Sequence, residues 1–180
     1  MFDKLGFRTS YYVVVNKLVV QQCSEEILTK VPVPKFISYD ARRWIKFTPE
    51  TMFLYCREGP KFYQDITRGV WQGATVTYIT MQLAYYMGFQ QVILIGVDHR
   101  FTTQGTANMT IVSDGDDPNH FSPGYFGKGF RWQLPDLQTS EAAYTMARNA
   151  FVRSGREVLD ATVGGRLTIF PKVDFGSLFK

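Results

Sequence analysis

Residues 73–101, GATVTYITMQLAYYMGFQQVILIGVDHRF, decide the fold. Apolar residues recur at helical spacing from Val76 to Met87, which predicts a helix. Gly88 follows them and suits the left-handed position that ends a helix. Residues 92–97, VILIGV, are apolar throughout, so we expect a strand that is covered on both faces, as in a parallel sheet.

Three polar residues, Asp98, His99 and Arg100, follow that apolar run directly. In open α/β sheets, ligands bind outside the carboxyl ends of the strands, so a site is expected here. A guanidinium holds phosphate through two parallel hydrogen bonds, which makes Arg100 either a phosphate ligand or a solvated arginine. For His99 we favour a structural role that anchors the loop over a role as ligand.

The rest of the chain alternates strand and helix patterns. Strands are expected over residues 11–15, 35–39, 52–55, 157–160 and 167–170, and helices over residues 18–29 and 140–153, the last capped by Ser140. Such alternation favours one α/β domain with an open, mostly parallel sheet. Neither GxGxxG nor GxxxxGK[ST] occurs, which disfavours a nicotinamide dehydrogenase or a Walker-type nucleotide hydrolase.

Composition further narrows the classes of protein to which this sequence could belong. The net charge of +4 comes from scattered basic residues, so no nucleic-acid surface is predicted. Cys23 and Cys56 show no disulfide or metal spacing, and two reduced thiols are expected. No signal peptide is recognisable and no apolar run approaches the ~20 residues of a membrane helix, from which we expect a cytoplasmic protein.

Two segments carry candidate chemistry. His120 lies in the polar run DPNHF, where a neutral imidazole can take a proton from a hydroxyl; the alternative is a loop histidine that bonds a carbonyl. Gly73, Ala74 and Thr75 precede the predicted helix, and the exposed amides at a helix start bind anions. Plain N-capping by Thr75 is an equally good interpretation.

Two further sets of polar residues are weaker candidates. Asn16 ends the first predicted strand, where its amide could contact a base or ribose or could simply form a turn. Asp114, Asp116 and Asp117 open a long irregular segment over residues 114–130 and could bind a hard cation. Their spacing lacks the pattern of a calcium loop, so we favour an acidic turn.

Three motifs together resemble a known family: TVTYITMQLAYYMGFQQVILIGVDHRF, DDPNHF and ATVGGRLTIFPKVDF. They resemble the bacterial MAF-like domain family, which includes flagellin motility accessory factors and proteins like 6-hydroxymethylpterin diphosphokinase. They are more distantly similar to the Campylobacter-type CMP-sugar sialyltransferases. The resemblance covers most of the chain, from about residue 11 to 179, and it implies a Rossmann-like, three-layer fold.

The resemblance also implies a chemistry. His120 matches the general base of those sialyltransferases, and Asn16 matches an asparagine that contacts the nucleotide. Residues 73–76 match a loop whose backbone binds the donor. At the position that matches Arg100 of this sequence, the sialyltransferases carry a tyrosine that binds the donor phosphate. The resemblance implies no tightly bound cofactor. It implies two substrates: a CMP-sugar or other nucleotide-sugar donor, and a glycan or protein acceptor.

One departure from the family is clear. Its members open with a strand and a glycine-rich turn of the type GNGPS, and this sequence begins after that unit, so we expect the unit to be lacking. Two alternatives to a glycosyltransferase therefore remain open. One is a Mg-ATP-dependent diphosphokinase that uses Asp98 and the acidic run. The other is a non-catalytic module, a possible homo-oligomer, with Tyr85, Tyr86 and Trp132 at an interaction face.

Overall fold

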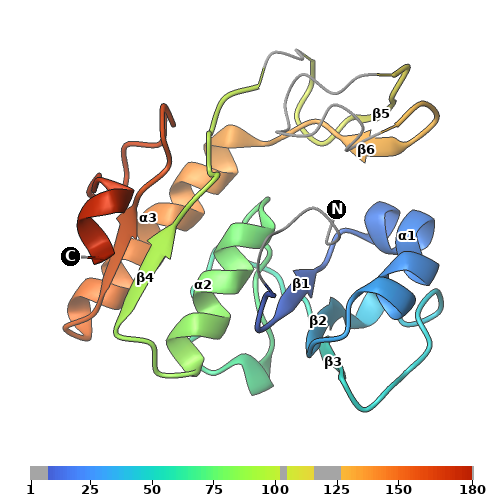
Figure 1. The fold of residues 1–180 in the computed structure, drawn as a ribbon, viewed down its shortest axis with the longest axis horizontal. Coiled ribbons are helices and arrows are strands. Elements are labelled where there is room, and N and C mark those ends of the chain that lie inside the picture. The colour runs from blue at the N-terminus through green and yellow to red at the C-terminus, as the bar shows by residue number, and fades with distance from the viewer. Residues whose placement is uncertain (1–7, 102–104, 116–126, 180) are drawn as a thin grey trace.

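The computed structural model describes residues 8–101, 105–115 and 127–179, and these form an α/β structure (Figure 1). The helices and strands in these ranges are, in chain order, β1 (Tyr12–Val14), α1 (Lys17–Lys30), β2 (Lys35–Ser38), β3 (Thr51–Leu54), α2 (Val76–Tyr86), β4 (Gln91–Leu94), β5 (Thr110–Val112), β6 (Arg131–Gln133), α3 (Leu137–Arg153) and β7 (Glu157–Asp160). Short 3-10 helices occupy Tyr39–Ala41, Ile66–Arg68 and Phe175–Phe179. The α/β class expected from the sequence is thus observed.

The strands form three sheets rather than one. β1, β2 and β3 pair in parallel in that order, β4 pairs in parallel with β7, and β5 pairs with β6 as an antiparallel hairpin. The four strands expected over residues 11–15, 35–39, 52–55 and 157–160 are present within a residue or two at each end. The expected strand over residues 167–170 is wrong, because those residues form no strand pairing with any described residue, and only Lys172, beyond them, bridges to Asp160.

The expected strand over residues 92–97 is also partly wrong. β4 ends at Leu94, and of its four residues only Leu94 is buried, so the strand is not covered throughout. Ile95, beyond the end of the strand, is 58% exposed. An apolar run shows that residues can be buried, but both faces of a strand are buried only where helices or another sheet pack on both of them.

Helix α2 links two apolar cores. Ile79 and Leu83 pack against the sheet of β1–β3, while Tyr78 and Met81 pack with α3, β4 and β7. A third core lies on the other side of β1–β3, under α1. The helix thus forms from the spacing that the sequence showed, and its buried sides face two different sheets.

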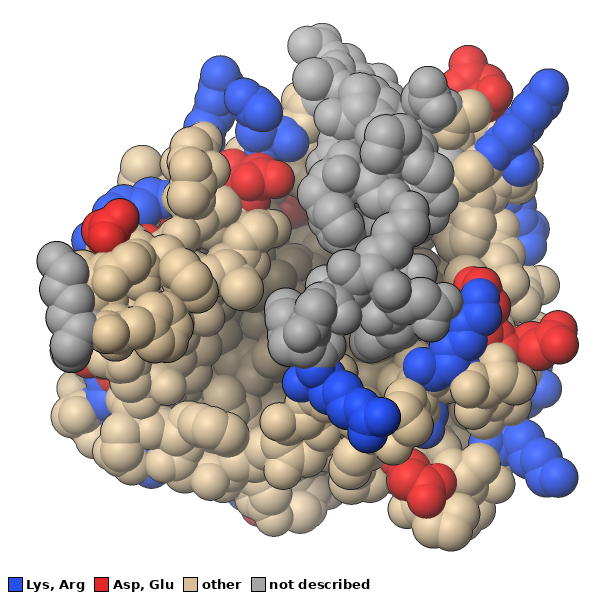
Figure 2. All heavy atoms as spheres, viewed as in Figure 1, with Lys and Arg blue, Asp and Glu red and all other residues tan. Residues whose placement is uncertain are grey.

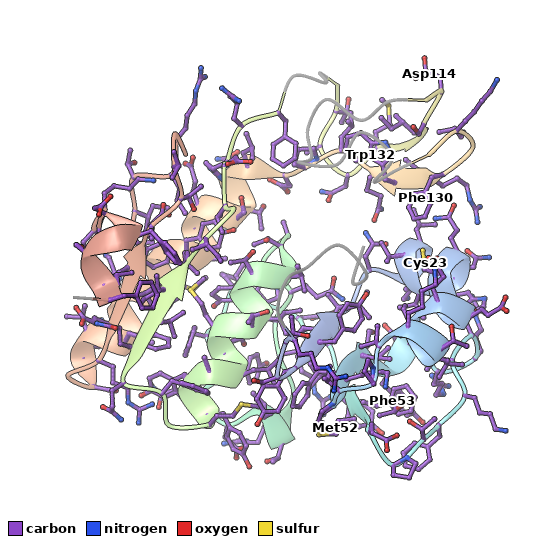
Figure 3. The ribbon with its side chains drawn as sticks, in the orientation of Figure 1. Cys23, Met52, Phe53, Asp114, Phe130 and Trp132 are labelled. Carbon is purple, nitrogen blue, oxygen red and sulfur yellow. The ribbon has the colours of Figure 1, made fainter. Side chains whose placement is uncertain are left out.

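The β5–β6 hairpin leans on α1 across the top of the molecule (Figure 1). The Gln22 side chain accepts a hydrogen bond from the Arg131 amide at 2.8 Å and donates one to the Arg131 carbonyl at 2.9 Å. Cys23 of α1 and Phe130 beside β6 lie on the facing sides of these elements (Figure 3). Sequence reasoning missed this hairpin, because it assigned residues 114–130 to a loop without the strands that flank it.

Cys23 and Cys56 are both free, as expected, and each is only partly buried. Burial raises the pKa of the Cys23 thiol, with a smaller contribution from Glu26. None of the helices in the described ranges has the length and apolar character to cross a membrane.

Candidate functional site

A pocket of about 180 Å³ lies where β4 ends and α2 begins. Its lining comes from the segment before α2 and the first turn of α2, the segment after β4, and the first turns of α3 with the residues before them. These residues are Ala74, Thr75, Thr77, Gly96, Val97, His99, Phe101, Pro135, Asp136, Leu137, Ser140 and Tyr144. The carboxyl end of β4, with His99 after it, and the start of α2, with Thr75 before it, therefore meet at this pocket.

The start of α2 has a strained and tightly packed backbone. Gly73 and Ala74 have positive φ angles of 54° and 58°, although alanine rarely adopts this region. Thr75 caps the helix by accepting a hydrogen bond from the Thr77 amide at 3.3 Å. The Val76 amide has no acceptor within the described part of the chain, so it can donate to an anion. The interpretation of Thr75 as a cap is therefore observed, and anion binding at the helix start stays a prediction.

His99 is held beside α3 by a carboxylate. Its Nε2 lies 2.9 Å from Glu141 Oε1, and its side chain is 9% exposed whereas that of Glu141 is 56% exposed. The backbone φ of His99 is 50°, a second non-glycine outlier in the pocket. Strained residues of this kind persist where surrounding structure holds them, and they are frequent at binding and active sites.

Tyr144 joins the two helices of the pocket. Its hydroxyl lies 3.3 Å from Thr75 Oγ1, and its ring meets the His99 ring at 6.1 Å between centroids. Burial raises the pKa of Tyr144, so the hydroxyl stays protonated and can donate at neutral pH.

Asp136 gives the pocket a negative charge. It caps α3 by accepting hydrogen bonds from the amide and the hydroxyl of Thr139, at 3.0 and 2.8 Å. These bonds hold the pKa of Asp136 below its usual value, so the carboxylate is ionised at neutral pH. The Asp136 carboxylate can therefore accept hydrogen bonds from hydroxyl groups of a ligand.

The structure separates the remaining candidate residues. Gly73 adjoins the pocket without lining it, and Asp98 and Arg100 are exposed beside it. Asn16 caps α1 by accepting from the Leu18 amide at 2.9 Å and also reaches Gln133 at 3.5 Å. His120, Asp116 and Asp117 lie outside the described residues, and Asp114 is exposed.

Sequence reasoning missed three residues of the site: Asp136, Glu141 and Tyr144. Tyr144 carried a weak signal, since Ser140 and Tyr144 are four residues apart on one side of a predicted helix. For Glu141 no signal existed, because its contact with His99 spans 42 positions of the chain and depends on how α3 is placed.

A larger hollow of about 300 Å³ lies on the outer side of α3, lined by residues that include Phe62, Asn149 and Arg153. Of its lining residues, Arg153 is the only charged one, and none is a base suited to neutral pH. We therefore place the candidate chemistry in the smaller pocket. In the described ranges, no group of three or more His, Cys, Asp or Glu residues is arranged to hold a metal ion.

Comparison with known proteins gave no matching family model, no matching curated protein and no matching solved structure.

Proposed function

We propose that this chain is a Rossmann-like, three-layer glycosyltransferase domain of the sialyltransferase type, which uses a CMP-sugar or another nucleotide-sugar donor. One observation supports the proposal most. A single pocket at the end of a parallel strand brings together the start of α2, at Thr75, and an imidazole held by a carboxylate, at His99. The first feature suits the donor phosphate and the second suits a sugar hydroxyl.

The proposed reaction is a direct displacement. His120 takes the proton of the acceptor hydroxyl, and the oxygen forms a bond to the anomeric carbon of the donor sugar. The bond from that carbon to the phosphate oxygen breaks, and the electron pair leaves with the nucleotide. The Val76 amide and the Thr75 hydroxyl stabilise the charge that develops on the leaving phosphate.

The negative charge around the pocket limits how a donor can lie. The ionised Asp136 would repel a phosphate placed beside it. The sugar hydroxyls are therefore proposed to face Asp136 and His99, with the phosphate against the start of α2. Tyr144, between the two, donates to either group.

The first experiment tests binding. A ligand that binds only the folded state raises the melting temperature, so the protein is heated with CMP, CMP-sialic acid, UDP-sugars, and ATP with and without Mg²⁺. A shift with cytidine nucleotides in the absence of metal is expected. A shift with Mg-ATP alone would instead indicate a diphosphokinase, and no shift with any of them would contradict a nucleotide-dependent transferase.

The second experiment uses the fact that the chain has only two histidines. His120→Ala should lower kcat by at least about a hundredfold and leave donor binding intact, because general bases contribute 10²–10⁴-fold. His99→Gln should instead weaken donor binding. If His120→Ala keeps full transferase activity while His99→Gln loses it, the base is assigned to the wrong histidine.

A further inference from the structure

The larger hollow, on the outer side of α3, has an apolar floor; we call it the outer hollow. Its volume of about 300 Å³ lies at the lower end of the range of about 300–1,000 Å³ that is usual for ligand pockets. Phe62, Met146 and Ala150 are its apolar lining residues. The Phe62 ring is half-buried and makes edge contacts with three further rings, those of Tyr78, Tyr85 and Phe151.

Both walls of the outer hollow are held in place by contacts within the chain. One wall is formed by residues 62–64, where the Tyr63 amide donates to Oε1 of Gln82 at 3.1 Å, and Gln82 is fully buried. The other wall is α3, on which the lining residues 146, 149, 150 and 153 share one side because of their spacing. A ligand would therefore enter a preformed site, which favours affinity because little of the protein has to become ordered.

Three polar side chains line the outer hollow beside this apolar floor, those of Gln64, Asn149 and Arg153. In the part of the chain that the structure describes, none of these three side chains forms a hydrogen bond or an ion pair with another residue. A guanidinium carries five N–H donors, and each amide carries two N–H donors and an acceptor oxygen. All of these groups are available to one ligand.

The outer hollow carries one positive charge, at Arg153. No carboxylate of a described residue lines it, and Asp65, next to Gln64 in the chain, accepts instead from the Thr67 amide and hydroxyl at 3.0 and 2.6 Å. A cation in the last turn also suits the carbonyl end of a helix, so Arg153 alone would indicate no ligand. The preformed hollow and the two free amides beside it are what indicate one.

The wider distribution of charge favours recognition by contact over attraction from a distance. Figure 2 shows Lys and Arg side chains mixed with Asp and Glu on the face that it draws, and the net charge is only +4. An anion would therefore be held by the groups that touch it. A guanidinium bonds a carboxylate through two parallel hydrogen bonds, and its single charge balances a carboxylate better than it balances a phosphate monoester.

We propose that the outer hollow binds a small aromatic carboxylate. The ring of this ligand lies between Phe62 and the lining side of α3, and its carboxylate bonds the Arg153 guanidinium. The amides of Gln64 and Asn149 donate to the remaining lone pairs of the carboxylate. The proposal stands independently of the glycosyltransferase reaction, because none of these residues lines the smaller pocket.

An NMR titration of the isotope-labelled full chain with naphthoate tests the proposal. Binding with a Kd of about 1 mM or tighter is expected, which is ordinary for a ligand of this size. The backbone amides of Phe62 and Ala150 and the side-chain amides of Gln64 and Asn149 should shift together.

Two further compounds separate the charge of naphthoate from its ring. The neutral analogue naphthamide should bind at least about threefold more weakly, which is the effect of a partly exposed ion pair. Acetate keeps the carboxylate but has no ring to bury, so it should bind at least about tenfold more weakly.

Three variants at exposed positions of α3 sharpen the result. Arg153→Gln should weaken naphthoate binding at least about threefold and leave naphthamide binding unchanged. Asn149→Asp places a carboxylate one turn before Arg153, where it competes for the guanidinium, and should have a similar effect. Arg148→Gln is the matched control, because it removes the same charge from the same helix outside the hollow, where Arg148 bonds the Ile169 carbonyl. It should leave naphthoate binding unchanged.

Four outcomes would overturn the proposal. The first is that the amides around the outer hollow do not shift at about 10 mM naphthoate, well above the expected Kd. The second is equal binding of naphthamide, which would show that no anion is recognised. The third is a shift confined to the amides of Thr75 and His99, which would place naphthoate in the smaller pocket. The fourth is an equal effect of Arg148→Gln and Arg153→Gln, which would assign the attraction to net charge.

Discussion

Two glycines near the pocket share a left-handed backbone but differ in their surroundings. Gly73 has φ 54°, and a Cβ placed there would lie 2.6 Å from Ala143 Cβ. Gly96 has φ 69° and no atom within 4 Å of that position. Gly96→Ala should therefore lower the free energy of unfolding by about 1 kcal/mol, the strain alone. Gly73→Ala should cost about 3 kcal/mol, because a clash with α3 adds to the strain.

Urea denaturation of both variants measures the difference. Equal losses would show that α3 can move away from the α2 start at little cost, against the close packing described here. The same variants can be examined for nucleotide binding, since Gly73→Ala should also displace Ala74 and Thr75.

Single residues differed in how far the sequence could predict them. Thr75 as a helix cap and Gly88 at φ 87° after α2 follow from local chemistry, and both are observed. The pairing of His99 with Glu141 follows from the placement of α3, which no local pattern encodes. For the same reason the sequence predicted where the site would lie better than which side chains would form it.

At the scale of elements, α3 begins earlier than the sequence indicated. Ser140 was expected as its cap, but the helix starts at Leu137 with Asp136 as the cap, and Ser140 is buried within the first turns. The prediction placed the cap at Ser140, shortly before Ala143, the first residue of the regular apolar pattern. It therefore overlooked the first turn of the helix, where the pattern is less regular. The error matters, because Asp136 is the charged residue of the pocket.

The Asp136 cap should make stability depend on pH. Its pKa is lowered from 3.8 in the folded state, mainly by the hydrogen bond from the Thr139 amide. A carboxyl group with a depressed folded pKa contributes stability that is present above its unfolded pKa and is lost as the pH falls through the folded value. Asp136→Asn keeps the cap but cannot titrate, so the difference in melting temperature between wild type and variant should change below about pH 4.

Melting curves of the two proteins from pH 7 to 2 provide the measurement. Parallel loss of stability in both would contradict this contribution of Asp136. Thr139→Val is a useful third protein, because it removes the hydroxyl bond at 2.8 Å and leaves the amide bond in place.

At the scale of the whole molecule, α2 is the element shared by two apolar cores. Met81 is fully buried, so Met81→Ala should lower the free energy of unfolding by about 3 kcal/mol. Because α2 also packs on β1–β3, the amides of Val14 and Val158 should both exchange faster in this variant. Met52→Ala is the matched control: Met52 is 38% exposed on β3, and its loss should cost within about 0.5 kcal/mol.

Urea denaturation and hydrogen exchange together decide this prediction. Faster exchange of Val158 alone, with Val14 unchanged, would show that the two sheets unfold separately and that α2 does not couple them.

The sequence predicted the class of the fold and most of its strands, but not the division into separate sheets. Apolar runs and helical spacing are local signals, and they indicated β1, β2, β3, β4 and β7 as well as the helices. Which strands lie side by side depends on contacts between distant segments.

The paired bonds between Gln22 and Arg131 have a mechanical consequence. The β5–β6 hairpin extends from the start of α3 to α1, so the sheets of β4 and β1 are connected at the top by this arm and lower down by α2 (Figure 1). Because these two sheets are connected at two levels, we expect both their approach and their separation to be resisted. The distance between the two sheets is therefore set by contacts within the described part of the chain.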